Sequence, residues 1–188
     1  GLGDVYKRQF QNTKLTSVTL PNSVTKIGAS AFNGCSLTTI NFGQGVKTIE
    51  NSAFQNCGEL TEIILPDATE TLGQNAFGDC PKLAKISLGK NMKTLEAYCF
   101  VGYSKGCPLL GDIICRATTP PTLKDDYGTG PFGGGWSPVA GKDVPAENRI
   151  IHLPKSADLV GGTGAYADSS WVKLTSSCLL YTSPSPRD

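Results

Sequence analysis

The chain has 188 residues, with 17 basic and 16 acidic side chains and a formal net charge of +1 at neutral pH. This balance provides no basic field for nucleic acid or for an anionic membrane surface. No apolar run approaches the roughly 18 residues that are needed to span a bilayer. The composition therefore argues against nucleic acid as a partner and against direct insertion into a membrane.

The two ends of the chain are related to each other through DNA. Residues 1–9 read GLGDVYKRQ, and a DNA sequence that encodes them has a reverse complement that encodes CLLYTSPSP, residues 178–186. The pair resembles the transposase adapter of sequencing libraries, read through from both ends of one fragment. We therefore expect residues 1–9 and 178–188 to be adapter-derived tails, which are excluded from reasoning about the fold. Without them, 14 basic and 14 acidic residues remain.

Between these ends, four segments repeat one pattern at a spacing of 22 or 23 residues. Each opens with a leucine, followed three and five places later by apolar residues and seventeen places later by Phe. The opening leucines are Leu15, Leu37, Leu60 and Leu83, and a fifth unit starts at Leu110. Phe10 matches the Phe of an earlier unit that is cut through. Self-similarity at this period predicts a leucine-rich-repeat solenoid over residues 10–118, and we expect residues 10–177 to be an internal piece of a longer protein.

Each unit is predicted to form two short strands and one helical turn. Stretches such as LTSVTLP favour a strand that the proline ends, and a second extended stretch follows it, as in residues 24–27. The segment ASAFNGC suits a helical turn at a corner. We therefore expect a right-handed β/α superhelix with parallel ladders and buried columns of Leu, Ile and Phe. Thr69 stands where the other units have Val or Met, so we expect the third coil to be the weakest.

Cysteines occupy one column of the repeat. They are Cys35, Cys57 and Cys80, each twenty places after the opening leucine. Parallel side chains favour a ladder of buried free thiols, although the ~4.8 Å spacing of stacked strands also allows a disulfide. In the fourth unit Tyr103 breaks the column, and Cys107 follows in a four-residue insertion. A Cys99–Cys107 disulfide is an alternative that the sequence leaves undecided. No C-x-x-C spacing occurs, so no zinc site is predicted.

The pattern fades after the fourth unit. Prolines at 120 and 121 break the chain direction, and residues 119–148 are predicted to form a loop rich in Gly and Asp. Residues 149–154 predict one more strand, and residues 156–174 predict a short helix. Residues 149–177 would then close the solenoid as an irregular C-terminal cap.

No constellation in the sequence predicts catalysis, a cofactor or a metal. His152 is the only histidine and is expected to face solvent from a strand, with no nucleophile beside it. Asp125 and Asp126 lack the spaced oxygen ligands of a calcium loop. The glycines of residues 128–136 follow no strand-to-helix pattern that would cradle a phosphate. We therefore expect a protein that is not an enzyme.

Strand alternation predicts a mostly polar row on the outer face of the first ladder. Its members are Ser17, Thr19, Thr39, Asn41, Glu62, Ile64, Lys85, Ser87, Asp112 and Ile114. A binding surface for a protein or a polar glycan chain fits this row, and so does a plain solvated face, because the row lacks the aromatic anchors of many interfaces. The loop aromatics Tyr127, Phe132 and Trp136 either form a second contact site or tuck onto the end of the solenoid.

The unit L-x-x-I-x-L-P-x-x-V-x-x-I-G-x-x-A-F-x-x-C resembles the BspA-like leucine-rich repeats of bacterial and some protist surface proteins. The segment LPNSVTKIGASAFNGC (residues 20–35) matches nearly every position of the motif. Residues 115–123 and 150–174 resemble the C-terminal closure of the same family. Thr69, the insertion after Tyr103 and the loop at 124–148 depart from its pattern.

The resemblance implies an extracellular or surface-anchored binding module, with adhesion as the usual role and a host extracellular protein among its partners. It does not imply a particular ligand, since fold does not fix function. The alternative that stays open is a structural spacer that displays another domain, such as an enzyme, outside this piece.

Overall fold

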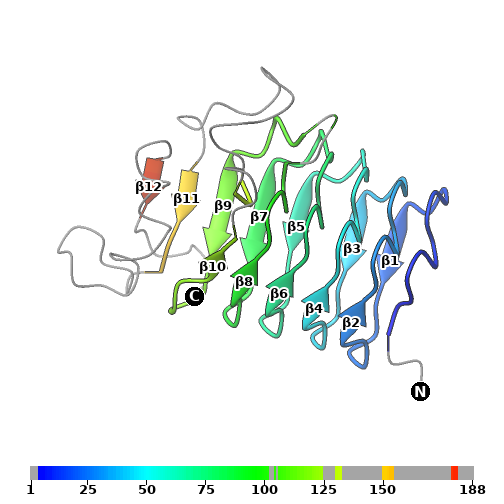
Figure 1. Ribbon diagram of the computed structural model, residues 1–188, viewed down its shortest axis with the longest axis horizontal. Helices are drawn as coiled ribbons and strands as arrows, with labels where there is room; N and C mark the ends of the chain where they lie inside the picture. The colour runs from blue at the N-terminus through cyan, green and yellow to red at the C-terminus, as the bar shows by residue number, and fades with distance from the viewer. Residues whose placement is uncertain are drawn as a thin grey trace.

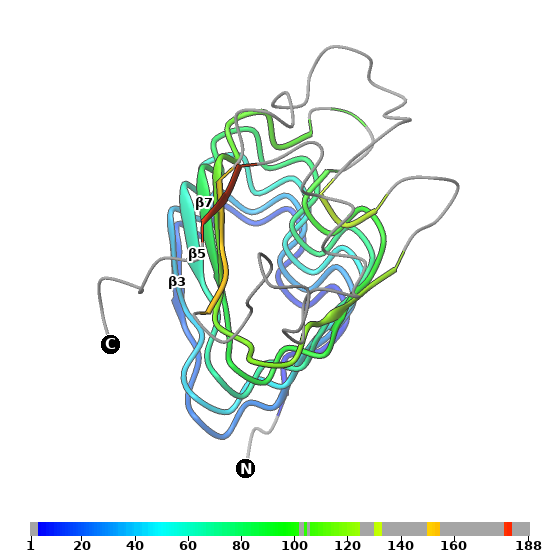
Figure 2. The same cartoon turned by 90° about the vertical axis from the view of Figure 1, so that its left-hand side faces the viewer.

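The computed structural model describes residues 4–101, 104, 106–124, 130–132, 150–154 and 179–181. The chain forms a solenoid whose coils lie side by side along its long axis (Figure 1). Seen along that axis, the coils superimpose around one interior (Figure 2), which a single apolar cluster fills. This confirms the predicted repeat solenoid with parallel strands and buried columns.

The opening motif of each unit forms the first ladder of parallel strands. Its strands are β1 (Ser17–Thr19), β3 (Thr39–Asn41), β5 (Glu62–Ile64), β7 (Lys85–Leu88), β9 (Asp112–Cys115), β11 (Ile150–His152) and β12 (Leu179–Tyr181). From β5 to β11 the register aligns Ile63, Ile86, Ile113 and Ile151, whose side chains are all buried. Among the described strands the ladder is interrupted once, because β1 and β3 form one sheet and β5, β7, β9, β11 and β12 form another.

The second strand of each coil forms a continuous five-stranded parallel ladder on another side of the solenoid. Its strands are β2 (Lys26–Ile27), β4 (Thr48–Ile49), β6 (Thr71–Leu72), β8 (Thr94–Leu95) and β10 (Thr122–Leu123). In the four strands β2 to β8 the second residue is a fully buried Ile or Leu. Two short strands per coil therefore agree with the sequence prediction.

The ASAFNGC segments form turns, and the prediction of a helical turn at each corner is wrong for the described residues. The N–H of Phe32 donates to the C=O of Ala53 in the next coil at 2.8 Å, and Phe54 donates to Ala76 at 2.8 Å. An α-helix would need these amides for bonds within the segment. Residues with positive φ recur at one position of the turn, namely Arg8, Ser30, Ser52, Asn75 and Tyr98. The turns thus provide a third line of hydrogen bonds between coils.

The phenylalanines of successive turns form one stack of rings. Neighbouring ring centroids lie 5.1 Å apart between Phe32 and Phe54 and 5.2 Å apart between Phe54 and Phe77, with interplanar angles of 3°. Phe10 and Phe100 continue the stack in both directions. Phe132, from the segment that follows the fourth coil, adds a further ring 5.3 Å from Phe100. Aromatic rings that stack and are buried in this way contribute strongly to a core.

Residues 4–9 continue the repeat toward the N-terminus. Val5 is buried and forms a parallel bridge with Ile27, and the N–H of Arg8 donates to the C=O of Ala29 at 3.0 Å. At the other end, β12 lies within residues 178–188 and pairs with β11. An adapter origin of these two ends stays a prediction, and the residues described there follow the geometry of the solenoid.

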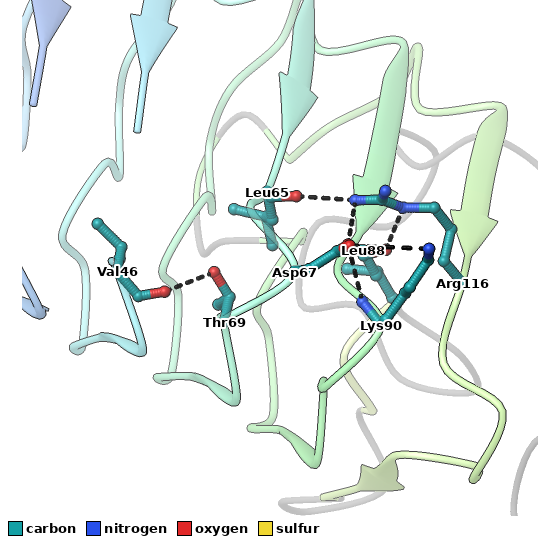
Figure 3. A network of polar contacts seen from close by, with 7 residues as sticks. All are labelled: Val46, Leu65, Asp67, Thr69, Leu88, Lys90 and Arg116. Atoms are coloured by element: carbon teal, nitrogen blue, oxygen red, sulfur yellow. Dashed lines mark hydrogen bonds and ion pairs between the residues drawn. The ribbon is translucent and has the colours of Figure 1, made fainter. Parts of the chain in front are cut away.

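Thr69 is not the defect that its place in an apolar column suggests. The residue is fully buried, and its hydroxyl donates to the C=O of Val46 at 2.9 Å (Figure 3). A buried hydroxyl with a hydrogen-bond partner costs far less free energy than an unsatisfied one. The structure therefore removes the reason for expecting the third coil to be the weakest.

The cysteine column has four members, and the fourth is Cys107. The thiols of Cys35, Cys57, Cys80 and Cys107 donate to the C=O groups of Phe10, Phe32, Phe54 and Phe77, over 3.0, 3.3, 3.4 and 3.3 Å. All six cysteines of the described residues are free and buried. Cys99 donates to the C=O of Glu96 at 2.8 Å. The Cys99–Cys107 bridge is therefore not formed, and the insertion before Cys107 leaves the column intact.

The insertion is anchored by Asp79, a buried carboxylate. Its Oδ1 accepts hydrogen bonds from the N–H groups of Ser104 and Gly106, over 2.8 and 3.0 Å. Its Oδ2 accepts one from the side-chain amide of Gln55 at 3.1 Å. Three donors compensate for taking the carboxylate out of water, and they let the chain leave the fourth coil and return to Cys107.

The buried thiols are expected to resist alkylation in the native chain. Burial raises the pKa of the Cys57 thiol to about 12 and also raises the pKa values of Cys80 and Cys99, while the thiolate is the form that reacts. Mass spectrometry after iodoacetamide treatment at pH 8 should find these residues unmodified in the native chain and modified in denaturant. Rapid native alkylation of Cys57 would contradict this burial.

The raised pKa of the Cys57 thiol also makes the stability of the fold decrease at high pH. The folded chain holds the Cys57 proton more tightly than the unfolded chain, whose thiol titrates near 9.0. The resulting stabilisation is complete below that pH and is lost as the pH rises toward about 12.

Candidate recognition surface

The outer face of the first ladder presents side chains of successive strands to solvent. Side chains of the predicted row lie on this face, but their exposure falls toward the C-terminal coils. All six members on β1, β3 and β5 are exposed, those on β9 are half-buried, and Ser87 on β7 is only 9% exposed. The accessible part of the row is therefore its N-terminal half, and Ile64 is its one strongly exposed large apolar side chain, at 56%.

Charges of alternating sign lie next to one another across three coils of this face. Glu62, Lys85 and Asp112 are register partners on β5, β7 and β9. The Lys85 Nζ atom lies 3.3 Å from Oε1 of Glu62, and both side chains are more than a third exposed. Surface ion pairs of this kind add little to stability. Their regular sign pattern instead gives the face an electrostatic signature that a partner can match.

His152 continues this row on β11 and does not simply face solvent. Its Nε2 atom lies 2.6 Å from Oδ1 of Asp112, and the two side chains are about one-third exposed, at 34% and 38%. The expectation of a free strand histidine is corrected by this contact. Forty residues separate the partners, so only the stacking of β11 on β9 brings them together.

A groove of about 370 Å³ opens on the same side of the solenoid, at the interruption between β3 and β5. Ile40 and Asn41 line it from one coil, Ile64 and Asp67 line it from the next, and Arg116 closes one end. Ile40 is half-buried there, whereas Ile63 and Ile86, its counterparts in later coils, are buried. The sequence gives no sign of this groove, because the motif of each strand is intact.

Arg116 holds the groove end by reaching back across two coils (Figure 3). Its Nη2 donates to the C=O of Leu65 at 3.0 Å and its Nε donates to the C=O of Leu88 at 3.2 Å. Nη2 also lies 3.0 Å from Oδ1 of Asp67, and Lys90 Nζ lies 3.9 Å from Oδ2 of the same carboxylate. Two cations thus share one anion, which leaves this end of the groove positively charged.

A second groove, of about 560 Å³, lies beside the second ladder. It is lined by polar side chains that include Glu50, Asn51, Glu96 and Lys124. Glu50 pairs with Lys26 at 2.7 Å, and this hydrogen bond holds the pKa of the Glu50 carboxyl below its usual range.

Of the three predicted loop aromatics, the structure describes only Phe132. Phe132 is 2% exposed and belongs to the ring stack, so it tucks onto the end of the solenoid and is not an exposed contact. Tyr127 and Trp136 lie outside the described residues. Within the described ranges, no group of three or more potential metal-ligating side chains is found, and no helix is long and apolar enough to cross a membrane.

Stacked coils of 22 or 23 residues with a ring column and two strand ladders define a leucine-rich-repeat solenoid. The BspA type leucine-rich repeat region matches residues 3–110 in six copies. The chain therefore belongs to the BspA-type leucine-rich-repeat family. No curated protein sequence matches the chain.

Several solved structures are similar to the chain. A leucine-rich cell surface protein from Faecalibacterium prausnitzii A2-165 has 26% identity and a TM-score of 0.56 over 60% of this chain and 29% of its own. A leucine-rich repeat protein from Eubacterium ventriosum has 27% identity and a TM-score of 0.50, over 66% and 38%. The pneumococcal vaccine antigen PcpA, with 21% identity and a TM-score of 0.65, shares the fold over 97% and 40%. The chain thus spans less than half the length of each.

Proposed function

We propose that the chain is a non-catalytic recognition module of a bacterial surface or secreted protein, with a role in adhesion. The observation that carries the proposal is the outer face of the first ladder, where three charges of alternating sign lie in register beside the exposed Ile64. Aligned charges and an apolar contact are what a protein partner recognises. The likeness to a bacterial cell surface protein at 26% identity supports an extracellular location.

The proposed ligand is a protein, with a host extracellular protein as the expected kind. A polar glycan is the weaker candidate, because the described part of the row carries no aromatic side chain on which a sugar ring could stack. These features and membership of the family support the proposed adhesion role.

The proposal is tested by inverting the charge row with Glu62→Lys, Lys85→Glu and Asp112→Lys in one variant. The Glu62–Lys85 attraction is preserved with opposite sign, so the solenoid should fold while the field outside it is reversed. Binding of the 188-residue chain to arrays of purified extracellular-matrix proteins and of glycans is then measured. We expect the variant to lose about tenfold or more in affinity for the partner that the parent chain selects.

The matched control reverses a similar ion pair away from the strands, with Glu59→Lys and Lys82→Glu. These side chains also join two coils, at 2.7 Å, and are about half exposed. The control should bind like the parent chain. Unchanged binding by the triple variant would exclude the ladder face as the site.

A structural spacer is the second candidate, favoured by the absence of aromatic side chains from the described part of the row. A spacer would display another domain of a longer protein. It predicts that the parent chain binds nothing on either array.

A further inference from the structure

We propose that the interruption between β3 and β5 is an acceptor site for an extended peptide segment of a partner protein, which adds as a strand between them. The inference rests on the proposed recognition role of this face and names the class of partner. It starts from the only discontinuity of the first ladder among the described residues.

The interruption has a cause in the lengths of two turns. The path from the column cysteine to the next strand is Cys35-Ser36-Leu37 before β3 and Cys57-Gly58-Glu59-Leu60 before β5. In the longer path the N–H of Leu60 closes the turn onto the C=O of Cys57, and later coils repeat this bond. Strands of neighbouring coils pair where the paths that lead to them contain the same number of residues. The paths that lead to β3 and β5 differ by one residue, so these two strands do not pair. Phe42 is also the larger residue in the column that Leu20 and Leu65 occupy.

The coils remain in contact elsewhere, so the interruption is local. The second ladder continues from β4 to β6, and Phe54 stacks on Phe77 at 5.2 Å. In Figure 3 the light-blue strand at the left, β3, stands apart from the strand that leads to Leu65, β5. Only the first side of the solenoid therefore opens.

Backbone hydrogen-bonding groups face this opening without ladder partners. The N–H of Leu20 donates to Asn41 at 2.8 Å and that of Leu65 donates to Ser87 at 2.9 Å. The equivalent N–H of Phe42 has no backbone partner in the described part of the chain, and the same holds for the N–H of Thr61, whose counterpart Ala84 donates to the C=O of Thr61 in the preceding coil at 2.9 Å. Unpaired strand edges of this kind accept an added strand.

The side chains around the opening fit an extended peptide. Ile40 is half-buried and Ile64 is 56% exposed, so each can contact an apolar side chain of an inserted strand. At one end, Arg116 and Lys90 share the single carboxylate of Asp67. The excess positive charge favours an acidic residue there. Main-chain donors on two facing edges match a peptide backbone better than a sugar, because only a peptide supplies donors and acceptors at strand spacing.

The test begins with a phage library of linear twelve-residue peptides, selected on the 188-residue chain. We expect selected peptides to contain an apolar residue and an acidic residue on one side of it. A synthetic copy of a selected peptide should bind at least tenfold more weakly to the Ile64→Lys variant. The Leu109→Lys variant is the matched control, because Leu109 is an apolar side chain of similar exposure, 58%, that lies outside the strands and the groove lining, and it should change the affinity less than twofold.

A second variant tests the origin of the site and does not remove any groove side chain. Insertion of one glycine between Ser36 and Leu37 makes the two paths equal, so β3 should join β5 and the peptide should lose at least tenfold in affinity. Circular dichroism and thermal unfolding check that this chain folds. Failure to select a peptide, or equal binding by the insertion variant in folded form, would overturn the inference. The charge-row variant reports separately on the proposed function, because its sites lie on β5, β7 and β9 and leave the backbone of the opening unchanged.

Discussion

Replacement of Phe54 with alanine is expected to lower the free energy of unfolding by about 3–5 kcal/mol, the usual cost of deleting a buried aromatic ring. Phe54 is fully buried and lies between two parallel rings, with Phe32 at 5.1 Å and Phe77 at 5.2 Å. The edge of Phe42 also packs against it, at 5.6 Å. Its loss would leave a cavity in three successive coils, and coils of a solenoid depend on their neighbours for stability.

Denaturant unfolding followed by circular dichroism measures this effect. Phe10→Ala is the matched control, because Phe10 is only half-buried and, among the described residues, stacks on Phe32 alone. The control should lose less than half as much free energy. Equal losses in the two variants would show that the ring column is not the continuous core that the structure describes.

Asp79→Ala is expected to destabilise the chain by about 3 kcal/mol. The substitution leaves the N–H groups of Ser104 and Gly106 and the side-chain amide of Gln55 without their acceptor. Each buried donor that loses its partner costs about 1–3 kcal/mol, and solvent that enters the insertion offsets part of the sum. Thermal unfolding of the variant and of the parent chain gives the difference.

Asp79→Asn separates the carboxylate from the geometry. Asparagine keeps one acceptor oxygen, and it tolerates the positive φ of 57° that Asp79 adopts. We therefore expect a smaller loss than for alanine. If Asp79→Ala lowered the stability no more than an exposed control such as Glu59→Ala, this result would contradict the anchoring role.

Much of the fold could be predicted from the sequence because each coil repeats the same constraints. The spacing of Leu60 and Leu83, and of the phenylalanines seventeen places after them, indicated which side chains share a column. The helical turn was predicted wrongly, because composition does not reveal that the amide of Phe32 bonds to the next coil. A tertiary hydrogen bond decided that local conformation.

Cys107 was missed as a member of the cysteine column, because counting from the opening leucine fails after an insertion. Cys107 lies three residues before Leu110, as Cys57 lies before Leu60, so counting backward from the next strand would have found it. The packing of Phe132 onto the end of the solenoid was one of two alternatives that the sequence left open. Phe132 follows a segment with no repeat pattern, and only the ring stack identifies it.

The candidate site could be predicted only in part. Strand alternation indicated the outward row, including Glu62 and Lys85. The contact of His152 with Asp112 and the reach of Arg116 to Leu65 join strands that are far apart in the sequence. The groove depends on a single extra residue, which a repeat analysis treats as ordinary variation in spacing.

The most direct test of the account is amide hydrogen exchange at the interruption, measured by NMR on the free chain. The account predicts that the amides of Phe42 and Thr61 exchange about tenfold or more faster than those of Leu65 and Ala84, which occupy the same repeat positions and are hydrogen-bonded. Addition of a bound peptide should slow both. Equal protection of all four amides in the free chain would show that β3 and β5 are paired, and it would contradict the acceptor site.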